Sequence, residues 1–123
     1  MLVKDKIIEI VAKSSHPLTA GEIQDKLKQC DRATTYRTLA KLKEEQLVRI
    51  IEIGDGVVRY ESQEDHHHHL ICLKCKEIER IDLPKKDEKR MHELQSDFQK
   101  KSKFSFLQHS LEFFGLCVNC KKL

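Results

Sequence analysis

Four of the five cysteines form two Cys-x-x-Cys pairs, which are Cys72 with Cys75 and Cys117 with Cys120. Four thiolates are the number and the soft ligand type that a closed tetrahedral zinc site needs. Because protein would then fill every position around the ion, no water would remain to be activated, and the spacing predicts a structural zinc rather than a catalytic one. A redox dithiol is the alternative, but it needs only one pair and a thioredoxin-like βαβ context, which is absent here.

A run of four histidines, His66 to His69, stands just before the first cysteine pair. In a strand, His67 and His69 would share one face while His66 and His68 share the other, so each pair can converge on an ion. Glu61 precedes the run and can add an oxygen ligand. Exposed histidines also bind metals adventitiously, but four in a row beside a zinc site favour true ligation.

Composition limits the class of protein that can carry these ligands. The chain has 123 residues, 39% hydrophobic and 35% charged, which is typical of a soluble folded protein with one ordinary domain or two small ones. Small domains bury thin cores, so a metal or a dimer interface is expected to help. The sequence shows no cationic-then-apolar leader and no apolar run near the roughly 20 residues of a membrane span, so we expect a cytoplasmic protein without membrane contact.

Three short helices are predicted before residue 47. Apolar spacing indicates the first over 4–13, Thr19 and Glu22 form a capping box for the second, and Asp31 can cap a third over about 32–46. The tight connection between the second and third is typical of a helix-turn-helix, and Cys30 is expected to be a small packing residue near that turn.

The third predicted helix has two different faces. At 100° per residue Thr35, Leu39, Leu42 and Gln46 share the face expected to be buried. The net charge of +3 is too small to indicate nucleic-acid binding, but basic residues gather from Lys26 to Lys41, where acidic ones are scarce. A solvated charged face is the alternative to a DNA-reading one. The candidate DNA-contacting residues are Arg32, Ala33, Thr34, Tyr36, Arg37 and Lys41.

After Leu47 the pattern changes to strands. Two β-branched runs around Gly54-Asp55-Gly56 predict a hairpin, which would serve as a wing and raises the case for DNA binding. Further on, residues 70–83 are strand-like, 87–101 form an amphipathic helix, and 104–115 are strand-like again. The predicted fold is α+β, with a winged helix-turn-helix domain at residues 1–60 and a small α/β domain at 61–123 that carries the structural zinc and forms the dimer.

Several motifs together resemble the ferric uptake regulator family across nearly the whole chain. They are Ala33-Thr34-Thr35-Tyr36-Arg37-Thr38-Leu39, Arg59-Tyr60-Glu61, HHHHLICLKC from His66 to Cys75, His109-Ser110-Leu111-Glu112 and Gly115-Leu116-Cys117. The resemblance implies a homodimeric, non-enzymatic repressor of metal-homeostasis or stress genes, whose metal-loaded form binds a palindromic, A·T-rich operator in double-stranded DNA. It also implies that Tyr36 and Arg37 face DNA and that the four paired cysteines hold structural zinc.

The resemblance also implies a sensing metal site between the two domains. The residues that match its ligands are Glu61, His67 and His69, with His16 contributed by the DNA-binding domain. Family members often carry an acid five residues after the second cysteine, where this chain has Arg80. A cation cannot ligate a metal, so that ligand is lost or supplied by Glu79 or Asp82. The ion can be Fe²⁺, Mn²⁺ or Zn²⁺, and the ligands do not choose among them.

A further family site uses a ligand just before the third cysteine, where this chain has Leu116. His66, His68 and His109 can form a reduced version of it, joined by an acid from Asp87 or Glu88. His92, among charged residues on the predicted helix, is expected only to be solvated.

Three alternatives are kept open. One is a peroxide-sensing regulator of the same family, although that branch typically has Asp where Glu61 stands. Another is a zinc-stapled thiol oxidoreductase or a zinc hydrolase, which would need a reactive cysteine or an open coordination position. The last is a zinc-stapled module that binds protein instead of DNA.

Overall fold

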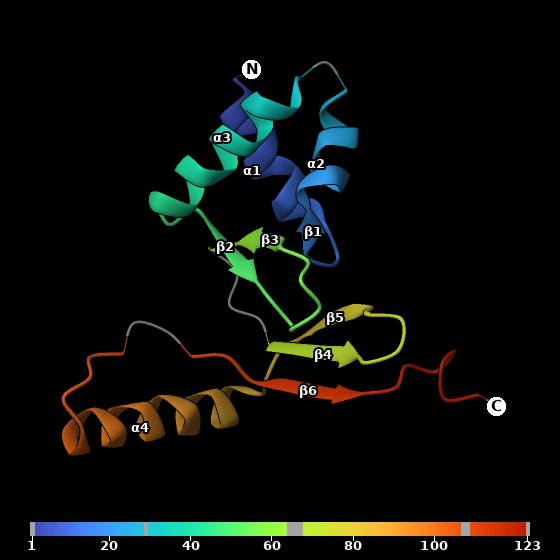
Figure 1. The fold of residues 1–123 in the computed structure, drawn as a ribbon. Coiled ribbons are helices and arrows are strands. Elements are labelled where there is room, and N and C mark those ends of the chain that lie inside the picture. The colour runs from blue at the N-terminus through green and yellow to red at the C-terminus, as the bar shows by residue number, and fades with distance from the viewer. Residues whose placement is uncertain (1, 29, 64–67, 107–108, 123) are drawn as a thin grey trace. The chain divides into compact units, whose positions relative to one another are not determined.

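The structure, a computed structural model, describes residues 2–28, 30–63, 68–106 and 109–122. The chain divides into two compact units, residues 1–66 and 67–123, and each has helical structure and a three-stranded sheet (Figure 1). The α+β class is therefore confirmed. Along the chain the elements are α1 (Val3–Lys13), β1 (Leu18–Thr19), α2 (Ala20–Leu27), α3 (Arg32–Glu44), β2 (Val48–Ile51), β3 (Arg59–Ser62), β4 (His68–Cys72), β5 (Ile78–Ile81), α4 (Lys85–Lys101) and β6 (Glu112–Gly115).

Helices α1, α2 and α3 of the first unit pack around a shared apolar core. Each helix places apolar residues three or four positions apart, so that they fall on one face, and that face is buried. The helical core residues are Ile7, Val11, Ala20, Ile23, Leu27, Leu39 and Leu42, and Leu18 and Val48 join them from the strands. No helix in the described part of the chain has both the length and the apolar character that crossing a membrane requires.

The predicted capping box begins α2. The Thr19 hydroxyl accepts the Glu22 backbone N–H at 3.1 Å, and the Glu22 carboxylate accepts the Thr19 N–H at 3.0 Å. The backbone N–H of Thr19 is the main reason why the pKa of Glu22 lies below its usual value. Two backbone groups that a helix start leaves without helical partners are thereby satisfied.

Replacing Thr19 by alanine is expected to lower the free energy of unfolding of the first unit by about 1 kcal/mol, because the Glu22 N–H loses its acceptor. Urea denaturation followed by circular dichroism measures this. Thr19→Ser, which keeps the hydroxyl, is the matched control and should unfold near the wild-type midpoint. An unchanged midpoint in Thr19→Ala would show that the cap contributes nothing.

The turn between α2 and α3 is fixed by side-chain hydrogen bonds. The Thr35 hydroxyl donates to the Gln24 side-chain oxygen, and the Gln24 amide donates to the Cys30 carbonyl. Asp31 caps α3 by accepting the Thr34 N–H at 2.7 Å. The predicted cap and the position of Cys30 at this turn are thus confirmed, while the Gln24 bridge was not predicted.

Helix α3 ends at Glu44, two residues before the predicted end. Gln46 takes a left-handed φ of 62°, and the Leu47 N–H reaches back to the Leu42 carbonyl at 2.9 Å. Gln46 is therefore exposed instead of continuing the buried face. The other three members of that face, Thr35, Leu39 and Leu42, are each 0% exposed.

The predicted hairpin is formed by β2 and β3, which pair antiparallel in a sheet of order β1-β3-β2. Gly54 and Gly56 adopt φ values of 86° and 78°, which favour glycine. The second strand begins only at Arg59, because Asp55 accepts the Val57 N–H and binds the Arg59 guanidinium at 2.9 Å, which holds Val57 in the loop. Glu61, where sequence analysis placed the start of the second domain, lies inside β3 of the first unit.

The second unit contains α4 and a sheet of order β5-β4-β6. Strand β4 pairs antiparallel with β5 and parallel with β6. The strand-like stretch predicted over 70–83 is two strands, because the chain turns at Lys76, whose φ is 67°. Helix α4 begins at Lys85 rather than at Asp87, since Pro84 suits a helix start and its carbonyl accepts the N–H groups of Asp87 and Glu88. Among the described residues of 104–115, only Glu112–Gly115 form a strand.

Candidate metal centres and nucleic-acid interface

The parallel pairing of β4 with β6 brings the two cysteine pairs together. Cys72 ends β4 and is paired with Gly115 of β6, so Cys117 follows two residues later beside it. The four sulfur atoms, from Cys72, Cys75, Cys117 and Cys120, all lie within 4.8 Å of one another. The Cys75 and Cys117 sulfurs are 3.8 Å apart. This arrangement fits the closed four-thiolate site that the spacing predicted.

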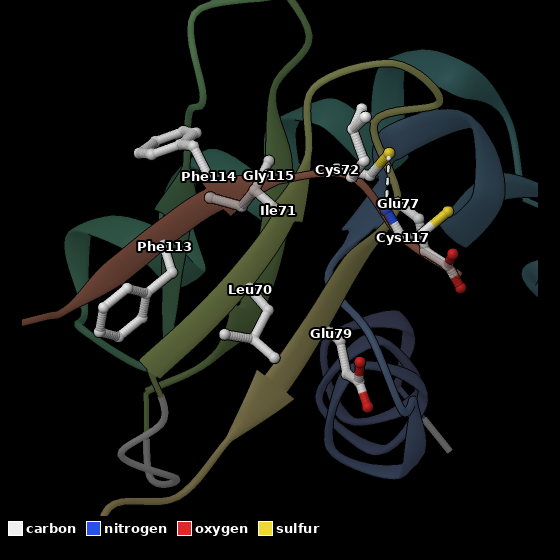
Figure 2. A pocket seen from close by; sticks show the side chains of 10 residues that line it. Leu70, Ile71, Cys72, Glu77, Glu79, Phe113, Phe114, Gly115 and Cys117 are labelled. Carbon is white, nitrogen blue, oxygen red and sulfur yellow. Dashed lines mark hydrogen bonds between the residues drawn. The ribbon is translucent and has the colours of Figure 1, made fainter. Parts of the chain in front are cut away.

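Backbone N–H groups prepare one of these sulfurs for ligation. The Cys72 sulfur accepts the N–H of Cys75 at 3.5 Å and that of Cys117 at 3.4 Å, the second of which is drawn dashed in Figure 2. These two contacts lower the pKa of Cys72 to about 6. The hydrogen bond with the Cys117 side chain raises the pKa of Cys120 to about 12. Four neighbouring thiols therefore cannot all ionise by themselves, and a divalent cation supplies the charge that allows it.

A second cluster joins β4, α4 and the segment before β6. His68, the first residue of β4, is 1% exposed and its Nε2 lies 2.9 Å from the Glu88 Oε2. The Nε2 of His109 contacts the other oxygen of Glu88, and its Nδ1 lies 2.8 Å from the Gln95 side-chain oxygen. The candidate ligand atoms of His68, Glu88 and His109 lie within 4.8 Å of one another. Of the two acids considered for this site, Glu88 is the one brought to it.

The four predicted sensing ligands are distributed over both units. His16 is exposed and its Nε2 lies 3.7 Å from the Glu22 carboxylate, whereas Glu61 is 0% exposed. His69 is 0% exposed in β4. His67, like His66, lies outside the described residues.

Glu61 has a cationic partner that the sequence analysis did not identify. Arg49 donates from Nε and Nη2 to the same Glu61 oxygen at 2.8 and 2.6 Å. Arg49 and Glu61 are paired in the β2–β3 register. The sequence would have predicted this pair if the length of the turn between the two strands had been known. A buried carboxylate is thereby paired with a cation and held in place.

Arg80, which stands where relatives often have an acid, lies opposite His69 in the β4–β5 register. Its neighbours Glu79 and Asp82 are both exposed. They remain the two candidates for the missing acid.

The candidate DNA-contacting residues form one exposed face of α3. Five of the six have exposed side chains and Thr34 is half-buried, while Tyr36 is 52% exposed although it is aromatic. The opposite face is fully buried, so packing fixes the direction in which this surface points. The exposed residues are Arg32, Ala33, Tyr36, Arg37 and Lys41.

Comparison with known proteins gives a consistent result. The family model described as the ferric uptake regulator family matches residues 3–114. The chain is 32% identical over 102 residues to the ferric uptake regulation protein of Bacillus subtilis, covering 80% of this chain and 65% of that protein, so it spans just under two thirds of that relative. It is 30% identical over 117 residues to the peroxide-responsive repressor PerR of Staphylococcus epidermidis, covering 92% and 74% respectively.

Solved structures of regulators from the same family are also similar to this chain. The Helicobacter pylori ferric uptake regulator Fur, described as having three functional metal binding sites, superposes with a TM-score of 0.74 at 25% identity, covering 98% of this chain and 81% of that one. The Campylobacter jejuni peroxide stress regulator superposes with a TM-score of 0.76 at 26% identity, covering 98% and 88%. The resemblance drawn from the motifs is confirmed, and the chain belongs to the ferric uptake regulator family of metal-dependent transcriptional regulators.

Proposed function

We propose that this protein is a metal-dependent repressor that acts in the cytoplasm on double-stranded DNA, at A·T-rich palindromic operators of metal-homeostasis or stress genes. The observation that carries the proposal is the α3 surface. A guanidinium, a phenol and small side chains are held outward on a helix whose other face is buried, beside a wing. Arg reaches guanine edges or phosphates, and small or aromatic side chains approach thymine methyl groups.

The proposed cofactors are a structural zinc at the four cysteines and a second divalent ion, Fe²⁺, Mn²⁺ or Zn²⁺, at a sensing site. The proposed sensing ligands are Glu61, His67, His69 and His16. Burial of Glu61 and the fixed position that Arg49 gives its side chain support its role as an oxygen ligand. The cluster around Glu88, with His68, His109 and the predicted His66, is proposed as an additional site.

Homodimer formation is supported by apolar side chains that the second unit leaves exposed. None of the 17 residues of α4 is buried, although Leu94 and Phe98 lie on it, and every residue of β6 is exposed. Figure 2 shows Phe113 and Phe114 projecting from β6 beside a pocket that Leu70 also lines. A second copy of the chain would remove this apolar surface from water.

The test measures the affinity of the zinc-loaded protein for an A·T-rich palindromic duplex, with and without added Fe²⁺, Mn²⁺ or Zn²⁺. A sensing ion that favours the DNA-binding state should tighten binding by about 5–150-fold for at least one metal. A scrambled duplex is the control. Equal affinity under every condition would contradict metal-dependent repression.

A peroxide-responsive repressor is the second candidate, because proteins of that kind are among the relatives at 30% identity. Glu61 in place of the usual Asp favours metal sensing. Operator affinity measured after brief peroxide exposure of the metal-loaded protein separates the two, since only a peroxide sensor should lose affinity irreversibly.

A further inference from the structure

The cluster around Glu88 contains a third imidazole that no ligand set includes. His92 lies one helical turn after Glu88 on α4, and residues four apart share a helix face. Its ring meets the His109 ring edge-on, with ring centres 4.8 Å apart and an interplanar angle of 83°. Two imidazoles bound to one tetrahedral zinc, with Zn–N bonds of about 2.0–2.1 Å, have ring centres roughly 5 Å apart. The spacing of the His92 and His109 rings is therefore close to that of two imidazoles that share an ion, and a turn of the His92 ring would direct a nitrogen to it.

Both ring nitrogens of His109 have partners, and the partner of Nδ1 shows which nitrogen could ligate a metal. The Gln95 side-chain N–H donates to the Phe106 carbonyl at 3.3 Å, which orients the amide so that its oxygen faces the His109 Nδ1 at 2.8 Å. An amide oxygen only accepts, so the His109 Nδ1 carries a proton. The His109 Nε2, which now contacts a Glu88 oxygen, is then the nitrogen that would ligate a metal in place of that contact.

His68 is held in the opposite tautomer. Its Nδ1 lies 2.8 Å from the backbone N–H of Leu111, which can only donate, so this nitrogen accepts and is not protonated. The proton of the neutral ring is then on Nε2, which lies 2.9 Å from the Glu88 Oε2 and donates to it. The Leu111 carbonyl accepts the His69 N–H at 3.0 Å and so fixes the position of Leu111.

A metal at the His68 Nε2 would require the tautomer with a proton on Nδ1, which would oppose the Leu111 N–H. That partly buried donor would lose its acceptor, at a cost comparable to a lost hydrogen bond. With its present hydrogen bonds, His68 orients Glu88 and leaves the metal to other residues.

Building on the additional metal site proposed above, we infer that Glu88, His92 and His109 ligate a divalent ion there, and that His68 is a positioning residue that orients Glu88. Two imidazoles and one carboxylate leave a fourth position for water or for another residue. Such a nitrogen-rich set favours Zn²⁺, Co²⁺ or Ni²⁺ over Mn²⁺. Because the His92 ring is exposed, it can turn a nitrogen towards the ion without disturbing packing.

The test observes histidine nitrogens directly. Long-range ¹H–¹⁵N correlation spectra of the protein with its cysteine site already filled by zinc distinguish protonated, bare and metal-bound nitrogens. Zinc held at defined free concentrations by a chelator should shift His92 and the His109 Nε2 to metal-bound values. The His68 Nε2 should keep its proton. Zinc-bound nitrogens on His68 or His66 with none on His92, or no zinc-bound nitrogen on His109, would overturn the assignment. No DNA is present, so failure of repression cannot be mistaken for failure of this site.

Variants give the second readout, which is the zinc affinity reported by the His109 nitrogen. His92→Gln should weaken it by at least roughly tenfold, whereas Glu93→Gln, an exposed carboxylate one residue later on α4, should leave it unchanged. His68→Leu should weaken binding, and His68→Gln should restore much of the loss, because an amide both accepts and donates as this tautomer does. Wild-type affinity in His92→Gln would overturn the inference.

Discussion

Replacing both Cys117 and Cys120 by serine is expected to unfold the second unit while the first stays folded. Among the described residues, the buried apolar ones of the second unit are only Ile71, Cys72 and Ile78. Burial of such a side chain stabilises the folded state by about 1.5–3 kcal/mol. Fixing the backbone of each residue costs about 1–2 kcal/mol of conformational entropy. The proposed structural zinc would contribute on the order of 10 kcal/mol and would fasten β6 to β4. Without it, the thin core cannot hold the sheet.

Amide hydrogen exchange and ¹H–¹⁵N spectra measure this unit by unit. Residues of β4, β5 and β6 should lose protection and shift dispersion, whereas α1, α2 and α3 should keep both. Cys30→Ser is the matched control, since Cys30 lies at the helix turn of the first unit and outside the cluster. Chelation of zinc from the wild-type protein should reproduce the double variant. A metal-free second unit with full protection would refute the proposed role of the ion.

Arg37→Ala should weaken operator binding by roughly a hundredfold in a dimer, since each base-contacting arginine contributes about 1–3 kcal/mol and two copies act together. The exposed Arg37 side chain lies in the second turn of α3, so truncation leaves the buried face intact. Affinity is measured by fluorescence anisotropy with a labelled A·T-rich palindromic duplex at fixed salt and metal.

Lys43→Ala supplies the control for this prediction. Lys43 is also exposed and cationic on α3, but at 100° per residue it lies on a different side of the helix from Arg37 and Lys41. Its loss should change affinity only slightly, through the general attraction of positive charge to phosphate. Equal effects of the two substitutions would indicate that α3 contributes charge and not base contacts. No effect of Arg37→Ala would favour the protein-binding module.

Sequence patterns within a few residues predicted the helix caps, the buried face of α3 and the hairpin turn, because short-range interactions determine each of these features. The Thr19 and Asp31 caps, the buried face of α3 and the glycine turn of the hairpin depend on neighbours within a few residues. Two strand predictions were wrong. Val57 was expected in a strand, but Asp55 holds it in the loop. Residues 104–115 were expected to be strand-like, but among those the structure describes only Glu112–Gly115 pair with β4.

In the candidate sites, short-range sequence patterns identified some of the residues and missed others. Two Cys-x-x-Cys pairs indicated a four-thiolate site because the residue types alone give the number and the type of ligands. The structure brings the four sulfurs together. Sequence spacing did not identify the partners supplied by distant elements. Arg49 meets Glu61 only through the hairpin register, and His92 meets His109 only because Phe106 and His109, which follow α4, lie back alongside that helix.

The sequence by itself determined the cysteine quartet, the helix-turn-helix with its outward-facing Arg37, and membership of the regulator family, since each depends on residue type at short spacing. The tertiary structure alone decided which carboxylate joins His109 and which nitrogen of His68 carries the proton. Those choices depend on the contact of His109 with Glu88 and on the hydrogen bond from the Leu111 N–H to His68, and both Glu88 and Leu111 lie far from the histidine run in the chain. A tautomer is set by the groups that face the ring, and only the fold brings those groups together.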